Sequence, residues 1–352
     1  MGEENPSKTS YLSDSEMASI PKNYILEGLM LPVHIYVKLK TNTYLTIAKK
    51  GEKAQIENFK GFRNEGFQLF VRAEDKAYLT GYIEDLSRRA MDNPQVGLDK
   101  KAQFVSGLLA DAYNDLENSK FSNVERLKSV GSLVIKICKQ ASNLHDVMDI
   151  LKHQRADDAK HGMMTAMVSV MLAEEAKMLS PLNQDKLVTG ALLHDVGLRT
   201  LPPELRRKPR HLWNAEESKH YQQHSIQGAE LLRFVEGMSV EVLLIISEHH
   251  ELSNGNGYPK GLRDARINPM SKIVGLADQF CDLVSNNEGK QYSAEDAIVY
   301  IEAVMGQPYN KGLFSSLKNL INVQRLTAKI AAKAAEGSAA SSDSESGAFS
   351  YT

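Results

Sequence analysis

Cysteine and net charge are scarce in this sequence, and it contains no long apolar run. Its two cysteines, Cys138 and Cys281, are too few for the disulfide framework of a small secreted domain. A formal net charge of −2 carries no electrostatic signature for DNA or for a membrane surface. No run approaches the roughly 20 apolar residues that span a bilayer, and the polar residues 1–19 lack the apolar core of a signal peptide. We therefore expect a cytoplasmic protein that binds neither DNA nor a membrane.

The length and composition indicate more than one structural unit with polar ends. A chain of 352 residues exceeds one minimal core, and 42% hydrophobic with 24% charged residues is typical of a soluble globular protein. Residues 1–22 are rich in Ser, Glu and Asn and are expected to be disordered. The low-complexity tail, residues 333–352, is expected to be disordered as well.

The first folded segment alternates apolar and polar residues, a pattern that predicts β-strands. The predicted elements are strands over 34–40, 44–47 and 67–71 and helices over 52–64 and 75–91. Together they indicate a small α/β regulatory module, residues 23–92. We expect this module to sense a signal or to bind a signalling protein partner.

The next segment shows apolar residues at helical spacing. We interpret residues 93–150 as connecting helices. If the helices over 102–150 pair with those of a second copy, the apolar stripe at Phe104, Leu108 and Tyr113 is where a homodimer would form.

Residues 151–332 are helical in pattern almost throughout, and eight of the ten histidines fall between positions 153 and 250. The whole chain is therefore predicted to be mainly α: a C-terminal helical bundle with the small N-terminal α/β module. The concentration of histidines favours a metal site over scattered structural roles for them.

Ligand-type residues end two apolar helical runs in this region. His249, His250 and Glu251 follow the run over 240–247, and His194-Asp195 follows another. An adjacent His and Asp point about 100° apart on a helix. The two side chains can reach one pocket only if the pocket wraps around the helix end. Such an arrangement suits a carboxylate that bridges two metal ions and an imidazole that binds one of them.

Two further positions add carboxylates and imidazole to this set. Asp157 and His161 are four residues apart and share one helical face, as a chelating pair would. Asp278 ends an apolar run, and a buried carboxylate needs a cation or hydrogen-bond donors to offset its desolvation. Taken singly, each residue also fits a structural role, such as a helix cap. Mixed imidazole and carboxylate ligands suit iron, manganese or zinc.

The order and spacing of these residues resemble one family. The segments that carry the resemblance are His194-Asp195-Val196-Gly197, Leu201-Pro202, Lys208-Pro209, His224 with Gly228, His249-His250-Glu251, Gly255-x-Gly257-Tyr258-Pro259-x-Gly261-Leu262, Ile267-x-Pro269 and Asp278. They are similar to the HD-GYP family, bacterial metal-dependent phosphodiesterases of the HD superfamily that hydrolyse cyclic di-GMP. The resemblance covers about residues 150–310 and implies an HD-type helical bundle for the metal-binding domain, residues 151–332.

The resemblance also implies a cofactor and its ligands. It implies two divalent metal ions, iron or manganese, held by His161, His194, Asp195, His224, His249, His250 and Asp278. Asp195 would be the bridging carboxylate. Some family members bind a third metal with a glutamate four residues before the first histidine. Asp157 occupies that place with a side chain one methylene shorter, so whether a third ion binds stays open.

Substrate contacts are less complete than the metal ligands. The residues that the resemblance and the basic segments suggest for them are Arg199, Lys208, Gly257, Tyr258 and Lys290. The family has Lys after the Gly of the HD segment, where this chain has Leu198 followed by Arg199. Tyr258 is expected to hydrogen-bond a phosphate oxygen or to stack on a base.

These observations lead to one functional hypothesis and two alternatives. The first is a phosphodiesterase that opens cyclic di-GMP to pGpG by a metal-activated hydroxide formed at His194 and Asp195; whether it goes on to GMP stays open. The second is a catalytically weak, metal-bound receptor for the cyclic dinucleotide or for a protein, as Leu198 suggests. The third is an HD phosphohydrolase of another nucleotide.

Overall fold

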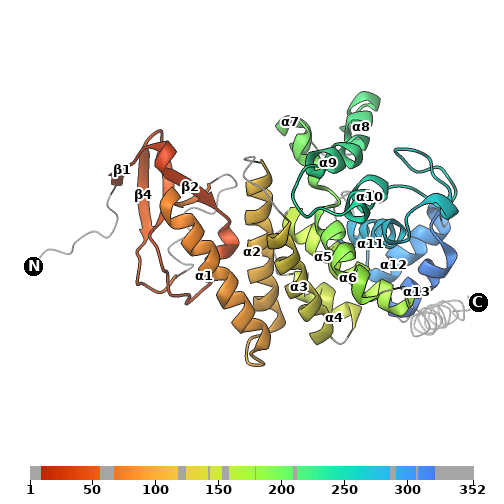
Figure 1. The fold of residues 1–352 in the computed structure, drawn as a ribbon, viewed down its shortest axis with the longest axis horizontal. Helices are drawn as coiled ribbons and strands as arrows, with labels where there is room; N and C mark the ends of the chain where they lie inside the picture. The colour runs from red at the N-terminus through yellow and green to blue at the C-terminus, as the bar shows by residue number, and fades with distance from the viewer. Residues whose placement is uncertain are drawn as a thin grey trace, which may run out of the picture.

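We analysed a computed structural model of the chain. It describes residues 9–55, 67–117, 124–141, 143–152, 158–178, 180–208, 212–285, 291–306 and 308–321. A β-sheet with one long helix lies at one end and a helical body at the other (Figure 1). The predicted fold class, mainly α with a small N-terminal α/β module and an HD-type bundle, is therefore confirmed.

The sheet has five antiparallel strands in the order β1-β4-β3-β5-β2. The strands are β1 Thr9–Tyr11, β2 Met17–Ile20, β3 Ile35–Lys40, β4 Thr43–Ala48 and β5 Leu69–Arg72. The predicted hairpin is confirmed as β3 paired with β4, and Asn42 in its turn has a left-handed φ of 53°, which asparagine tolerates. The third predicted strand is β5. Ile35, Val37 and Leu69 are buried and join the core that α1 also helps to form.

The expected disorder of residues 1–22 is wrong for the part that the structure describes. Thr9 pairs with Leu45 at one edge of the sheet, and Met17 pairs with Arg72 at the other. These strands have only three and four residues, so their hydrogen-bond partners, which are distant in sequence, decide their structure. The helix predicted over 52–64 lies mostly outside the described residues.

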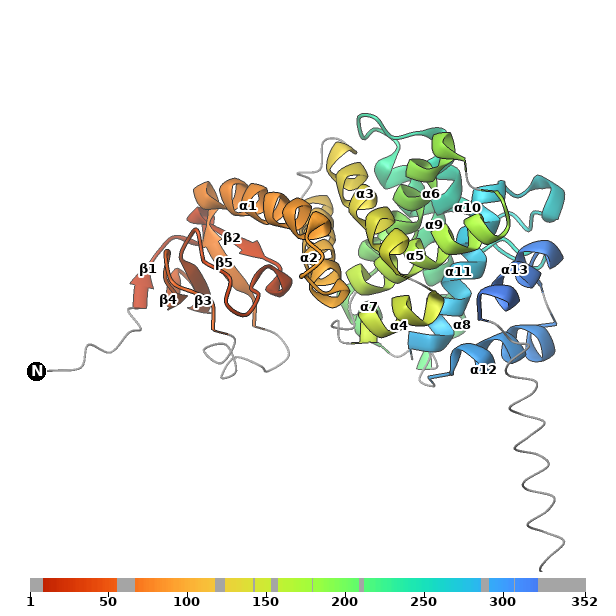
Figure 2. The same cartoon turned by 90° about the horizontal axis from the view of Figure 1, so that it is seen from below.

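Four helices follow the sheet along the chain (Figure 2). They are α1 Ala73–Asp92, α2 Leu98–Glu117, α3 Glu125–Gln140 and α4 Leu144–Lys152. The stripe proposed as a dimer surface is buried inside the chain, because Phe104, Leu108 and Tyr113 of α2 are 9%, 1% and 4% exposed. They belong to the continuous core, and α2 packs against α3 and α5. This corrects the expectation that they pair with a second copy.

The helical body carries the histidines on several short elements. Its elements are α5 Asp158–Glu175, α6 Pro181–Leu193, η4 Val196–Thr200, α7 Pro203–Arg207, α8 Ala215–Gln222, α9 His224–Leu232, α10 Val240–Glu248, α11 Pro269–Ser285, α12 Ala294–Val299, the π turn η7 Tyr300–Val304 and α13 Lys311–Ile321. Short 3-10 turns occur at η1 Asp14–Glu16, η2 Lys22–Tyr24 and η6 Asp264–Arg266. Helix α6 packs against α5, α10 and α11, and α11 also packs against α5 and α10.

One hydrophobic core runs from the sheet to the last helix. Buried residues from Ile20 in β2 to Ile321 in α13 belong to a single contiguous cluster. The described helices include none long and apolar enough to cross a membrane. The tail over 333–352 lies outside the described residues.

Candidate metal centre

The ends of two buried helices deliver most of the candidate ligands. Helix α6 is buried from Leu187 to Leu193, so His194 and Asp195 emerge where its apolar surface stops. Helix α10 ends in the same way at His249, followed by His250. The polar pairs thus come from the points at which each helix leaves the core.

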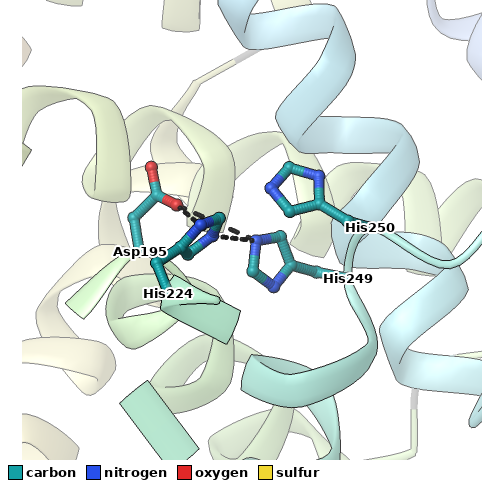
Figure 3. Close-up of side chains that lie close together, drawn as sticks. All are labelled: Asp195, His224, His249 and His250. Carbon is teal, nitrogen blue, oxygen red and sulfur yellow. Dashed lines mark hydrogen bonds and ion pairs between the residues drawn. The ribbon is translucent and has the colours of Figure 1, made fainter. Parts of the chain in front are cut away.

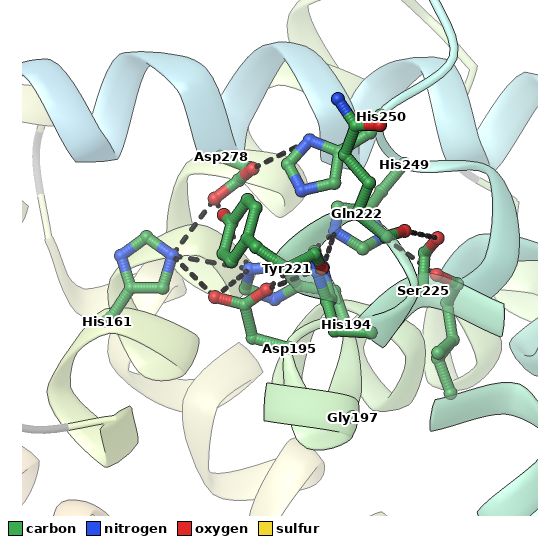
Figure 4. A network of polar contacts seen from close by, with 12 residues as sticks. His161, His194, Asp195, Gly197, Tyr221, Gln222, Ser225, His249, His250 and Asp278 are labelled. Carbon is green, nitrogen blue, oxygen red and sulfur yellow. Dashed lines mark hydrogen bonds and ion pairs between the residues drawn. The ribbon is translucent and has the colours of Figure 1, made fainter. Parts of the chain in front are cut away.

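Three further ligands come from other helices. His161 lies on the first turn of α5, His224 is the first residue of α9, and Asp278 lies in the middle of α11. His194 and His224 have no exposed surface, and Asp278 is 4% exposed. All seven ligands implied by the resemblance therefore come from five helices and the segments that follow them into one buried to half-buried cluster (Figures 3 and 4).

Asp195 lies between two groups of imidazoles. Its Oδ1 is 3.2 Å from His224 Nε2 and 3.8 Å from His249 Nε2 (Figure 3). Its Oδ2 is 3.6 Å from His194 Nε2 and 3.8 Å from His161 Nε2. One carboxylate thus presents one oxygen to each histidine pair, which is the arrangement of a bridging ligand.

Backbone carbonyls orient three of the imidazoles. The Nδ1 atoms of His194, His224 and His249 lie 2.7, 2.6 and 2.8 Å from the carbonyl oxygens of Ala191, Tyr221 and Ile246. A carbonyl only accepts, so each Nδ1–H donates, and in the neutral imidazole, the form that binds a metal, each Nε2 keeps a lone pair directed into the cluster.

The cluster fits divalent metal ions. His161 Nε2 and His194 Nε2 are 3.2 Å apart, and His224 Nε2 and His249 Nε2 are 3.3 Å apart. His250 Nε2 is buried and has no hydrogen-bond partner among the described residues. Lone pairs that face one another and a buried nitrogen without a partner are satisfied by a cation.

The electrostatics of the cluster support the same fit. Burial lowers the pKa of His194, but Asp195 and Asp278 outweigh it and raise that pKa to about 10. Burial together with His194 and His224 lowers the pKa of His249 to about 3. Burial raises the pKa of Asp278, but His194 and His161 outweigh it and hold that pKa well below its usual range. The buried carboxylates therefore stay ionised, and positive charge beside them is favoured.

The residues predicted to contact substrate have mixed positions. The Tyr258 ring lies 4.6 Å from the His250 ring, centroid to centroid. Arg199 Nη2 lies 3.3 Å from Asp158 Oδ2, at the start of the helix that carries His161.

Lys208 and Gly257 make contacts within the chain. Lys208 Nζ pairs with Glu217 at 2.7 Å. A Cβ at Gly257 would collide with the backbone of His250 and Leu252, so a close approach of the turn requires glycine there. Asp157 and Lys290 lie outside the described residues.

Two residues next to the cluster were not predicted from the sequence. Asp282 lies one turn after Asp278 on α11, with Oδ1 3.7 Å from His161 Nδ1. The sequence feature that could have identified Asp282 is its spacing of four residues from Asp278, which places both on one helical face. The Tyr221 ring lies 4.8 Å from the His224 ring and 5.1 Å from that of Trp213. Nothing in the sequence around Tyr221 indicated this position.

Comparison with known proteins identifies the family. The HD domain family matches residues 135–312, about half of the chain. The chain therefore belongs to the HD domain family, and its motifs and relatives identify it as a member of the HD-GYP branch.

Two phosphodiesterases match part of the chain. The chain is 36% identical over 121 residues to 3'3'-cGAMP-specific phosphodiesterase 1 of Vibrio cholerae serotype O1, covering 34% of this chain and 27% of that protein. It is 30% identical over 173 residues to the cyclic di-GMP phosphodiesterase of Thermotoga maritima, which covers 47% of this chain and 46% of that protein. The chain thus spans less than half the length of these relatives.

A solved structure shares the fold. Bd1817, an HDG"Y"P protein from Bdellovibrio bacteriovorus, matches with a TM-score of 0.71 and 21% identity, over 87% of this chain and 99% of that one. The match includes most of the chain outside the HD domain.

Proposed function

We propose that this chain is a metal-dependent phosphodiesterase that hydrolyses cyclic di-GMP to the linear dinucleotide pGpG. The observation that carries the proposal is the position of Asp195, whose two oxygens face separate histidine pairs inside a buried cluster. A shared carboxylate suits two neighbouring cations. The names of the relatives, cyclic di-GMP and 3'3'-cGAMP phosphodiesterases, support the substrate class.

Two ligand sets that share Asp195 would hold the cations. The first contains His224, His249 and His250, and the second contains His161, His194 and Asp278. When bound, iron or manganese would lower the pKa of water and stabilise charge on the phosphoryl oxygens. The contribution of the chain is orientation: carbonyls hold three imidazoles with Nε2 inward, and the packed helices exclude bulk water from them.

The substrate side of the proposal uses a cation and an aromatic ring. Arg199 lies on η4, four residues after Asp195, and its guanidinium suits a phosphate oxygen pair. The Tyr258 ring beside His250 suits a base or a phosphate oxygen. These two contacts would orient the scissile phosphate toward the cluster.

A receptor without useful turnover is the second candidate. Leu198 replaces the lysine that the family places there, and the neighbouring Arg199 is engaged by Asp158. A weaker phosphate contact would retain binding through the metal cluster while slowing hydrolysis.

The test is hydrolysis of cyclic di-GMP by protein loaded anaerobically with measured amounts of iron or manganese. We expect turnover by the wild type. The double variant His194→Ala/Asp195→Ala should lose at least a hundredfold in turnover, because it removes two of the groups that would hold the metal ions. His220→Ala is the matched control, because His220 is an exposed histidine on α8 outside the cluster.

The other outcomes separate the alternatives. Full metal occupancy with no turnover would contradict the proposal, and binding of intact cyclic di-GMP would then identify a receptor. Faster hydrolysis of 3'3'-cGAMP than of cyclic di-GMP would assign the other substrate of the same class.

A further inference from the structure

Tyr113 is a buried phenol outside the matched HD domain, and it contacts the end of the helix that presents His194. It lies on α2 and is 4% exposed. Its hydroxyl donates to the carbonyl oxygen of Leu192 in the last turn of α6. Carbonyls in the last turn of a helix lack partners within the helix. Tyr113 thus satisfies one carbonyl at the helix end that presents His194, while His194 itself donates to the adjacent carbonyl of Ala191.

The same hydroxyl also fits against the helix that carries His161. A Cβ built on Gly162 of α5 would lie only 2.7 Å from the Tyr113 oxygen and 3.1 Å from the Leu192 carbonyl oxygen. Gly162 directly follows His161 in the sequence. The phenol therefore lies between α5 and α6, close in sequence to His161 on one helix and to His194 after the other. It occupies the space that a side chain at position 162 would need.

The ring of Tyr113 contacts a third element of the site. The guanidinium carbon of Arg199 lies 4.8 Å from the ring centroid, and its Nη2 lies 3.3 Å from Asp158 Oδ2. A guanidinium over an aromatic face is attracted by the electron density of the ring. Tyr113 and Asp158 together limit the directions in which Arg199 can point.

Helix α2 itself is held rigidly. Asp111 lies about half a turn before Tyr113 with a fully buried side chain. It forms ion pairs with Arg126 of α3 at 2.6 Å and with Lys76 of α1 at 3.1 Å. The phenol is therefore fixed relative to the sheet module as well as to the metal centre.

We propose that Tyr113 is a positioning residue for the metal centre. Its hydroxyl holds the helices of His161 and His194 at the separation that the metal ligands need, and its ring orients Arg199 toward substrate. The part that concerns Arg199 rests on the proposed function, whereas the part that concerns the metal ligands does not.

The first experiment measures the affinity for Mn²⁺ alone, by competition with a chelator and by the electron paramagnetic resonance of the bound ion. Tyr113→Phe removes the hydroxyl and keeps the ring. We expect about tenfold weaker binding and a changed spectrum, the low end for loss of an outer-shell contact.

Tyr44→Phe is the matched control for this variant. It removes a hydroxyl whose bond to Asp14 Oδ1 is 2.8 Å long, in the sheet and away from the ligands. It should bind Mn²⁺ as the wild type does. Equal affinities for the wild type and Tyr113→Phe would overturn the proposal.

A double-mutant cycle tests the position of the hydroxyl. Gly162→Ala should weaken Mn²⁺ binding in the wild-type background, because its Cβ displaces the phenol. In the Tyr113→Phe background the same change should cost at least threefold less. Equal losses in both backgrounds would show that Gly162 acts without Tyr113 and would contradict the proposal.

The contribution of the ring is measured with the loaded protein. Tyr113→Leu should raise KM for cyclic di-GMP several-fold above that of Tyr113→Phe at saturating Mn²⁺, with kcat similar in the two variants. An equal KM would remove the role of the ring. If no variant hydrolyses a cyclic dinucleotide, the proposed function fails, and the Mn²⁺ measurements alone decide the role of Tyr113.

Discussion

At the scale of single residues, the role of Glu251 differs from the one that its two neighbouring histidines suggest. It follows His249 and His250 as a third ligand would, but its carboxylate points into the turn that follows. Oε1 accepts the Lys260 N–H and Oε2 accepts the Leu262 N–H, each at 2.7 Å. Glu251 therefore closes the loop that places Tyr258 beside His250.

Glu251→Gln should reduce stability and leave the metal content unchanged. Glutamine offers one acceptor oxygen where two backbone N–H groups need one each, and loss of a hydrogen bond to a charged group costs about 1.5–3 kcal/mol. The free energy of unfolding by urea and the metal content by mass spectrometry measure the two effects. A protein that keeps its stability and loses metal would instead make Glu251 a ligand.

At the scale of secondary-structure elements, an ion-pair cluster joins α1, α2 and α3. Asp111 accepts from Arg126, from Lys76 and from the hydroxyls of Tyr24 and Thr80. Burial raises the pKa of Asp111, but Arg126 and Lys76 outweigh it and lower that pKa below its ordinary value. Helices α2 and α3, which the sequence indicated as connectors, are thus bound to each other and to α1 of the predicted α/β module by buried charge.

Asp111→Asn should destabilise the protein in a pH-dependent way. Removing one partner of a buried ion pair costs several kcal/mol, and we expect about 3 kcal/mol at pH 7, the low end, because Asp115 remains beside both cations. The folded pKa is the lower one, so this stabilisation is complete above the unfolded pKa of about 3.9 and is lost as the pH falls through the folded pKa.

Urea unfolding at pH 7 and near pH 3 measures this dependence. The difference in the free energy of unfolding between Asp111→Asn and the wild type should be smaller at the lower pH. Asp85→Asn, which breaks an exposed ion pair with Arg89, is the control and should cost less than about 1 kcal/mol. A difference independent of pH would mean that Asp111 does not act through its charge.

At the scale of the whole molecule, the continuous core couples the sheet to the metal centre. The buried cluster extends from Ile20 to Ile321 without a break, so the described parts are expected to unfold together. Trp213, the one tryptophan of the chain, lies beside Tyr221 next to the ligands and reports on that end.

Mn²⁺ should therefore stabilise the sheet as well as the helical body. At a free concentration of about 100 times Kd, a ligand that binds only the folded state adds about 2.7 kcal/mol. Trp213 fluorescence during urea unfolding and amide hydrogen exchange in β3 and β4 should report the same gain. A gain confined to the helical body would show that the two ends unfold independently.

The sequence by itself indicated the candidate ligands, and it determined the elements whose signals are local. His194, His249 and Asp278 are recognisable because each interrupts or ends an apolar run, and spacing along one helix follows from its own periodicity. The hairpin of β3 and β4 was predicted for the same reason, since its alternation and turn lie within a few residues.

Only the tertiary structure decided which distant surfaces meet. The apolar stripe with Phe104 and Leu108 correctly indicated that these side chains are buried. It did not indicate what covers them, because the core of one chain and a dimer interface need the same pattern. The strands at Thr9 and Met17 depend on partners elsewhere in the chain. Tyr113 carries no local sign of its hydrogen bond to Leu192, because that contact exists only once α2 packs against α5 and α6.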